Sequence, residues 1–202
     1  IELVDDKRIE GISDVVDHSS MEGMRVVIDL KKDAVFETKE TDIDISNYYS
    51  VRLSGLEAGT KYRYTVGSDE NRSAEYSFET EPENLDKFSF IVITDHQKGD
   101  PCHLPDYSKV GAMLNRALER HPECKFIFTA GDNCDNGQNE LQWNGMFEGL
   151  KGIIESRPYM MTTGNHDNRG FKDYRNGIGR YYSEPAEFFG KQFKGAYPYN
   201  GP

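Results

Sequence analysis

Residues 125–137 read KFIFTAGDNCDNG, a short apolar run that passes directly into an acidic loop. The apolar part, KFIF, is typical of a strand buried inside a domain. Two carboxylates, Asp132 and Asp135, follow where that strand ends. A buried carboxylate is unfavourable unless a positive or hydrogen-bonding group meets it. The stretch therefore predicts a partner for these acids: a metal ion, a substrate or water.

The residues on either side of this stretch alternate between strand and helix patterns. The run KFSFIVIT (87–94) is almost continuously apolar, which is typical of a strand covered on both faces, and YMMTT (159–163) predicts a third strand. Apolar residues recur at helical spacing in 106–121, with Asp106 as the cap, and in 139–156. The expected apolar positions are Val110, Met113, Leu114, Ala117, Leu118, Trp143, Met146, Phe147, Leu150 and Ile154. This order predicts a parallel sheet with right-handed crossovers.

Residues 1–80 instead alternate with period two. The pattern in KYRYTV (61–66) predicts a buried face of Tyr62, Tyr64 and Val66 and a solvent face of Lys61, Arg63 and Thr65. The segments YSVRLS (49–54), with Tyr49 inward, EYSFET (75–80) and RVVIDL (25–30) predict further strands of an antiparallel β-sandwich. A polar segment at 81–86 separates the two rhythms. We therefore expect one domain at 1–82 and another at 87–202.

Polar side chains follow each of the three buried strands. Asp95 lies in TDHQKGD (94–100), Asp132 in GDNCD (131–135), and Asn165 in GNHDNRG (164–170). Functional groups gather at the carboxyl ends of parallel strands, so these three side chains are expected to converge. Their oxygens, with His166 close by, suit a divalent metal. A single Asp after a strand is more often a turn residue or a helix cap, but three such loops in order favour a metal site.

These motifs resemble a known family. TD (94–95), GDNCD (131–135) and GNHD (164–167) are similar to the first three signature blocks of the calcineurin-like metallophosphoesterases. YSVRLSGLEAGTKYRYTVGS (49–68) and AEYSFETEPE (74–83) resemble the fibronectin type III-like domain that precedes the catalytic domain of purple acid phosphatases. The resemblance implies a fibronectin type III-like β-sandwich followed by α/β structure, the latter the N-terminal half of a metallophosphoesterase α/β/β/α sandwich.

The resemblance also implies a ligand set for two metal ions: Fe, Zn or Mn. Asp95 would bind the first ion, Asp132 would bridge both, and Asn165 would bind the second. Gln97 stands where many members have a histidine ligand, and its amide oxygen is a weaker ligand for zinc-like metals than imidazole. Asp135 would orient the ligands. Purple acid phosphatases have a tyrosine at the Asp135 position, so their tyrosinate chromophore is expected to be absent.

The catalytic role would fall to His166, held by Asp167, as general acid or phosphate stabiliser. The implied reaction is hydrolysis of a phosphate ester by metal-activated water. Arg169 and Arg175 follow closely and would bind the substrate's phosphate. The alternative for these arginines is a solvated basic loop.

The chain departs from the family pattern after these motifs. It has no histidine after His166, whereas the family completes its site with further histidines. We therefore expect the N-terminal part of an enzyme, without a full binuclear centre or appreciable activity as an isolated chain. Half a sheet would leave an apolar face uncovered, and that face would associate with a second copy or a complementary fragment. The alternative function is a non-catalytic interaction module.

Charge and cysteine content limit which other classes of function the chain could have. Residues 1–86 contain 10 Lys or Arg against 21 Asp or Glu, whereas residues 87–202 contain 14 of each. The acidic first part argues against nucleic acid as its partner, and no apolar run approaches the roughly 18 residues of a membrane span. Three cysteines without metal-binding spacing predict free structural thiols. The compartment is not readable from the N-terminus, and only the family resemblance favours a secreted or periplasmic protein.

Overall fold

The computed structural model describes residues 3–4, 8–9, 14–16, 24–40, 45–98, 104–168, 189–190 and 193. By its internal contacts the chain divides into two compact units, one comprising Ile1–Thr38 with Asn47–Lys87 and the other Lys39–Ser46 with Phe88–Pro202. No helix within the described ranges is long and apolar enough to cross a membrane.

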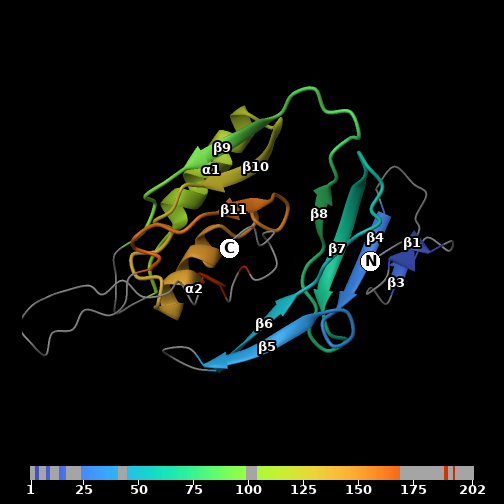
Figure 1. The fold of residues 1–202 in the computed structure, drawn as a ribbon, viewed down its shortest axis with the longest axis horizontal. Coiled ribbons are helices and arrows are strands. Elements are labelled where there is room, and N and C mark those ends of the chain that lie inside the picture. Colours follow the sequence, from blue (N-terminus) through green and yellow to red (C-terminus); the bar gives the residue numbers. More distant parts are fainter. Residues whose placement is uncertain are drawn as a thin grey trace, which may run out of the picture. The chain divides into compact units, whose positions relative to one another are not determined.

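The N-terminal part of the chain is built from strands (Figure 1). A four-stranded sheet has the order β3 (Asp14–Val16), β4 (Met24–Asp29), β7 (Lys61–Gly67) and β8 (Tyr76–Glu79). Two further pairs are β1 (Leu3–Val4) with β2 (Arg8–Ile9), and β5 (Val35–Glu40) with β6 (Ile45–Ser50). This part of the molecule is therefore β-rich, as predicted.

The prediction of a purely antiparallel arrangement is wrong for the centre of this sheet. Strands β4 and β7 run parallel, with Met24 opposite Tyr62 and Val26 opposite Tyr64. β3 and β8 pair antiparallel with their neighbours, so the sheet is mixed. The physical reason lies in the connection: β5 and β6 intervene between β4 and β7, and a long crossover lets the chain return in the same direction.

The core of this unit forms around Val26, Ile28 and Tyr62, which are almost fully buried. The Tyr62 hydroxyl accepts a hydrogen bond from the Glu57 N–H at 2.8 Å, which anchors the turn before β7 as in a tyrosine corner. Two predictions fail here. Thr65 was expected to face solvent but is buried, and Tyr49 was expected inside but is 46% exposed. Because β6 ends at Ser50, YSVRLS does not continue as one alternating strand.

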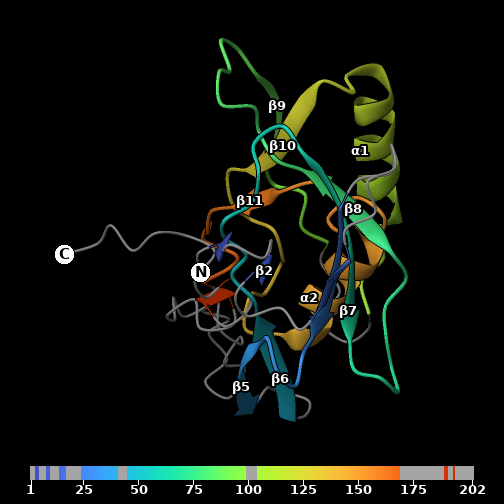
Figure 2. The same cartoon turned by 90° about the vertical axis from the view of Figure 1, so that its right-hand side faces the viewer.

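The second unit contains the predicted parallel sheet. Its strands are β9 (Ser89–Ile93), β10 (Cys124–Thr129) and β11 (Tyr159–Met161), in the order β11-β10-β9 and all parallel. The helices α1 (Ser108–Arg120) and α2 (Glu140–Gly149) connect them, and α1 lies beside β10 in Figure 2. The prediction that the three strands are neighbours is confirmed. Their carboxyl ends consequently meet at one edge.

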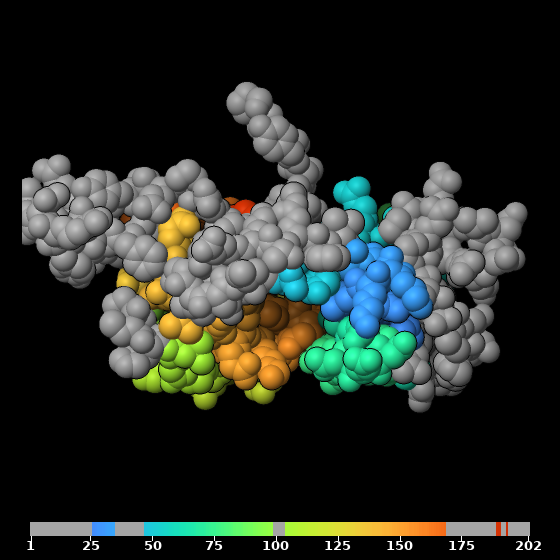
Figure 3. Space-filling model, turned by 90° about the horizontal axis from the view of Figure 1, so that it is seen from below, coloured from blue at the N-terminus to red at the C-terminus, as the bar shows by residue number. Residues whose placement is uncertain are grey.

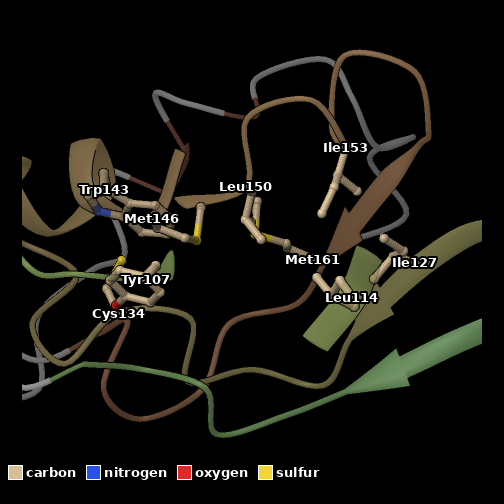
Figure 4. Close-up of a cluster of buried hydrophobic side chains, with 9 residues drawn as sticks. All are labelled: Tyr107, Leu114, Ile127, Cys134, Trp143, Met146, Leu150, Ile153 and Met161. Carbon is tan, nitrogen blue, oxygen red and sulfur yellow. The ribbon is translucent and has the colours of Figure 1, made fainter. Parts of the chain in front are cut away.

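One apolar core joins the helices to one face of this sheet. Figure 4 shows Trp143 and Met146 of α2 beside Tyr107 and Cys134, and Leu114 of α1 near Ile127. Side chains of α1 and of the α2 region also touch at the surface, yellow-green against orange in Figure 3. Both predicted helices are present, but α2 ends at Gly149 and not at 156, and the N-cap of α1 is Tyr107 and not Asp106. Met113 is 50% exposed and not part of the core.

The other face of the sheet is open. Phe88, Phe90, Val92 and Met160 are 40% to 56% exposed. Phe126 stacks on Phe90 with ring centroids 4.8 Å apart. The prediction that KFSFIVIT is covered on both faces is therefore wrong for this chain, whereas the expected uncovered apolar face is present. Parallel sheets are normally covered on both sides, whereas these side chains of the described sheet are exposed on this one.

Candidate metal and catalytic site

Three loops meet at the carboxyl edge of the β9–β10–β11 sheet. The Asp95 N–H donates to the Gly131 carbonyl at 3.3 Å, which joins the first loop to the second. Both Asp95 and Asp132 adopt left-handed backbone conformations, with φ of 51° and 53°. Residues other than glycine seldom adopt this conformation, and Asp tolerates it better than most. Each acid thus stands at a sharp turn directly after its strand.

The second and third loops approach each other at van der Waals distance. A Cβ on Gly131 would lie 2.8 Å from the Gly164 nitrogen, and a Cβ on Gly164 would lie 2.1 Å from Asp132 Oδ1. Any side chain at either glycine would push the loops apart. The glycines of GDNCD and GNHD therefore permit backbone contact between two candidate ligand loops.

Asp167 is fully buried between these two loops. Its Oδ1 accepts from the N–H groups of Asn133 and Cys134, both at 3.0 Å, and its Oδ2 accepts from the Gly164 N–H at 2.8 Å and Asn133 Nδ2 at 3.0 Å. Burial raises the pKa of Asp167, and these hydrogen bonds oppose the rise. The carboxylate joins the second loop to the third.

Asn133 extends the same network into the sheet. Its Oδ1 accepts from Thr129 Oγ1 at 2.6 Å, and its Nδ2 also donates to the Thr162 carbonyl at 2.9 Å. The Tyr107 hydroxyl donates to the Asn133 carbonyl at 3.0 Å. Asn133 is fully buried, and this satisfied network fixes where Asp132 projects.

His166 contacts a different acid from the one predicted. Its Nδ1 lies 3.0 Å from both the carbonyl oxygen and Oδ1 of Asp135. Its backbone N–H donates to Asp132 Oδ1 at 2.9 Å. The prediction that Asp167 holds His166 is wrong, because the Asp167 carboxylate points into the 133–134 backbone. Both oxygens of Asp135 are acceptors, so this contact favours a proton on Nδ1.

The first loop is less enclosed. Asp95 is exposed and accepts from Thr94 Oγ1 at 2.6 Å. His96 turns inward, with Nε2 3.4 Å from the Tyr159 hydroxyl, and burial lowers the pKa of His96 to about 4. His96 Nδ1 and Gln97 Oε1 are buried, and neither has a hydrogen-bond partner among the described residues. The His96 ring thus lies against Tyr159, whereas the Asp95 carboxylate is exposed.

The predicted donors suit one side of a cation site. Asp95, Asp132, Asn165 and Gln97 offer only carboxylate and amide oxygens, and Gln97 Oε1 lacks a partner. Oxygen donors suit hard divalent cations. Among the described residues, however, no group of three or more His, Cys, Asp or Glu side chains is arranged to hold a metal ion. The oxygen donors fit part of a coordination shell.

Some predicted residues take no part in this site. Arg169 and Arg175 lie outside the described residues, as does Cys102. Cys124 and Cys134 are free and buried, which confirms the prediction of structural thiols for these two. Burial raises the pKa of Cys134. A buried neutral thiol is unreactive.

Several important polar residues were not predicted from the sequence. Asn133, Gln142 and Thr129 are fully buried and bonded within the site loops or to them. A recognisable pattern was present: most residues from Asp132 to Gln142 are polar, yet they lie between two apolar elements. A polar stretch in that position indicates a buried hydrogen-bond network.

Comparisons with known proteins agree with this geometry. Residues 19–80 match the family model of the purple acid phosphatase N-terminal domain. The structure resembles purple acid phosphatase PPD1 from yellow lupin (Lupinus luteus) seeds, with a TM-score of 0.59 and 18% identity. The match covers 80% of this chain and 32% of the lupin chain, so this chain spans about a third of that protein. At this identity the similarity shows the fold alone.

The curated proteins that match are DNA gyrase A subunits, over short segments. Those of Salmonella typhimurium and Escherichia coli are 51% and 49% identical over 49 residues, which is 24% of this chain and 5% of each gyrase chain. The Synechocystis subunit is 38% identical over 69 residues, 32% of this chain and 8% of the gyrase. These segments are too small a part of gyrase for its activity to be assigned here.

The second domain has the broader match. Residues 88–201, more than half of the chain, match the family model of the calcineurin-like phosphoesterases. This range includes the parallel sheet, both helices and the three acidic loops. The chain belongs to the calcineurin-like phosphoesterase family.

Proposed function

We propose that this chain provides the first three loops of a two-metal centre in a phosphate ester hydrolase. The single observation that carries the proposal is the His166–Asp135 contact, with Nδ1 3.0 Å from Oδ1, directly beside Asp132. A histidine fixed against an acid, next to clustered oxygen donors at the end of a parallel sheet, suits general acid–base chemistry. The family match supports the same reaction class.

The chain's own residues would divide the work in the following way. Asp95, Asp132, Asn165 and Gln97 would hold metal ions, and we propose that further ligands come from outside the described residues. Bound Fe, Zn or Mn ions would neutralise the phosphate and activate water. Asp135 would orient the His166 ring, and Nε2 of the doubly protonated ring would meet the leaving-group oxygen and deliver its proton there, which leaves the neutral Nδ1–H tautomer. Asp167 would keep the two loops in contact without touching the substrate.

Metal binding by this chain tests the ligand assignment. Calorimetric titration with Mn²⁺ should show binding to the wild-type chain, and Asp132→Asn should weaken it at least about tenfold. Mutation of residues that only hydrogen-bond to a metal ligand already lowers metal affinity by about this factor, so loss of a ligand should lower it at least as much. His166→Ala should leave Mn²⁺ affinity within about twofold, because the bond from His166 to Asp132 comes from the backbone N–H, which alanine keeps. Equal loss in both variants would contradict the division of roles.

Turnover tests the reaction. The polypeptide that the gene encodes should hydrolyse p-nitrophenyl phosphate or its bis-ester, and His166→Ala should reduce turnover by about 10²–10⁴-fold, as expected for loss of a general acid. Comparing monoester with diester hydrolysis would assign the substrate class. Metal-loaded protein without activity on either ester would exclude the proposal.

The open sheet face supports a second candidate, an interaction module. Phe88, Phe90, Val92 and Met160 form its exposed apolar surface. We propose that this face associates with a second copy or a complementary fragment of the fold. Sedimentation of wild type against Phe90→Lys would test this: the variant should be lighter, because a charge on a buried interface is unfavourable. A monomeric wild-type chain would exclude self-association.

A further inference from the structure

The first residues of α2 hold the loop that contacts His166. Gln142 and Trp143 are adjacent in sequence and fully buried. Gln142 Oε1 accepts from the N–H groups of Asp135 at 2.8 Å and Asn136 at 3.2 Å. Trp143 Nε1 donates to the Gly137 carbonyl at 2.9 Å. Two consecutive helix residues therefore satisfy three backbone groups of residues 135–137.

The other side of this loop touches His166 directly. Asp135 meets the ring at Nδ1, and the Gly137 N–H donates to the His166 carbonyl at 3.0 Å. A Cβ on Gly137 would lie 1.9 Å from the Asp167 carbonyl oxygen. The loop consequently lies between α2 and His166, in contact with both. A displacement of the loop would move the His166 ring.

The helix itself is firmly anchored. The Trp143 ring packs against Phe189 and Phe193, with centroids 6.2 Å and 6.0 Å away. Met146, one turn further along α2, is fully buried in the core. A rigid support of this kind is what a catalytic histidine requires, because small displacements of reacting groups reduce rates severely.

We propose that Gln142 and Trp143 are positioning residues that hold His166 in its Nδ1–H tautomer through residues 135–137. This inference rests on the proposed function, in which the His166 ring meets the phosphate ester. Gln142 keeps the Asp135 backbone in place, so that its carbonyl and carboxylate both face Nδ1. Trp143 keeps Gly137 against the His166 backbone. Neither residue touches the substrate in this arrangement.

The tautomer of His166 is the measurement that separates positioning from simple stabilisation. Two-dimensional ¹H–¹⁵N NMR of protein with ¹⁵N-labelled histidine distinguishes Nδ1–H from Nε2–H rings, and His166→Gln identifies the signal among the five histidines. In Gln142→Leu, the ratio of Nδ1–H to Nε2–H should fall about tenfold, the effect expected from loss of about one hydrogen bond. Trp143→Phe, which keeps the ring packing, should cause a smaller fall.

Two variants serve as controls. Gln142→Glu keeps an acceptor oxygen for the N–H groups of Asp135 and Asn136 and should restore the wild-type ratio. Met146→Leu changes an equally buried residue of the same helix whose side chain lies in the apolar core, and should leave the ratio unchanged. A folded Gln142→Leu protein with the wild-type ratio would overturn the proposal. If Gln142→Leu does not fold, an unchanged ratio in Trp143→Phe would overturn it instead.

This readout is independent of the reaction. The ratio is measured without metal or ester, so the positioning role stands or falls on the NMR result. An unproductive enzyme with the expected tautomer shifts would refute the proposed function while leaving the positioning role intact. Unchanged tautomers in an active enzyme would refute only the positioning role.

Discussion

The loops at the carboxyl edge of the sheet differ in how completely they are built. After β10 and β11, Asp167 and Asn133 are fully buried and bonded at every polar atom of their side chains. After β9, Asp95 is exposed, and in the part of the chain that the structure describes His96 Nδ1 and Gln97 Oε1 are buried without partners. The chain itself therefore preorganises the His166 side, whereas buried polar atoms on the Asp95 side have no hydrogen-bond partner among the described residues. Four measurements of unfolding free energy would test this contrast.

Loss of the Asp167 carboxylate should have the largest effect. Asp167→Ala leaves the N–H groups of Asn133, Cys134 and Gly164 buried without their acceptor. We expect a loss of about 3–5 kcal/mol, because each orphaned donor costs about 1–3 kcal/mol. Urea unfolding followed by circular dichroism measures this. A loss below about 1 kcal/mol, at the scale of a surface change, would mean that the network is not a rigid unit.

The second largest effect should be the pH dependence of the unfolding free energy that His96 contributes. Burial lowers its pKa from 6.5 to about 4. Between these pH values the unfolded chain binds a proton that the folded chain does not, so stability rises as pH increases from 4 to 6.5 and is lost as pH falls. The full difference is about 3 kcal/mol.

Urea unfolding at pH 4.5 and 7.5, with a chelator present, would measure the His96 contribution. In His96→Gln the difference between the two pH values should shrink. His121→Gln serves as the matched control, because the side chain of His121 is 61% exposed. If His96→Gln and His121→Gln gave the same pH dependence, the first loop would be more open to water than its burial indicates.

Loss of a single hydrogen bond between uncharged side chains of this network should lower the free energy of unfolding by a smaller amount. Thr129→Val removes the donor to Asn133 Oδ1 with almost no change of shape, and leaves that oxygen buried. We expect a loss of about 1–2 kcal/mol. Thr162→Val is the control: it removes a bond from Thr162 Oγ1 to the Thr129 carbonyl, but this side chain is exposed and water can replace it. Equal losses of stability in the two variants would show that the buried and the solvent-exposed hydrogen bond contribute equally.

The smallest effect should come from Asp95. Asp95→Asn keeps an acceptor for Thr94 and tolerates the left-handed φ of 51°. We expect stability within about 0.5 kcal/mol of wild type, as for an ordinary surface position. The same urea titration checks it. A larger loss would show that the first loop is as tightly built as the second, and the contrast between them would fail.

Part of this site was predictable because it depends on local pattern. Buried strands read as continuous apolar runs and helices as periodic ones, so the neighbours β9, β10 and β11 and the helices between them followed from residues 87–163. Parallel strands place their carboxyl ends together, which brought Asp95, Asp132 and the 164–167 loop to one edge. These features need no knowledge of distant contacts.

Other features depended on contacts between residues far apart in sequence. The sequence alone determined that acids and His166 would gather at the sheet edge, but only the tertiary structure decided that His166 meets Asp135, 31 residues away, and not its neighbour Asp167. Adjacent side chains project in different directions, and the direction depends on what each loop packs against. The parallel pairing of β4 with β7 and the buried Thr65 were decided in the same way, by a crossover and a core that short-range patterns do not encode.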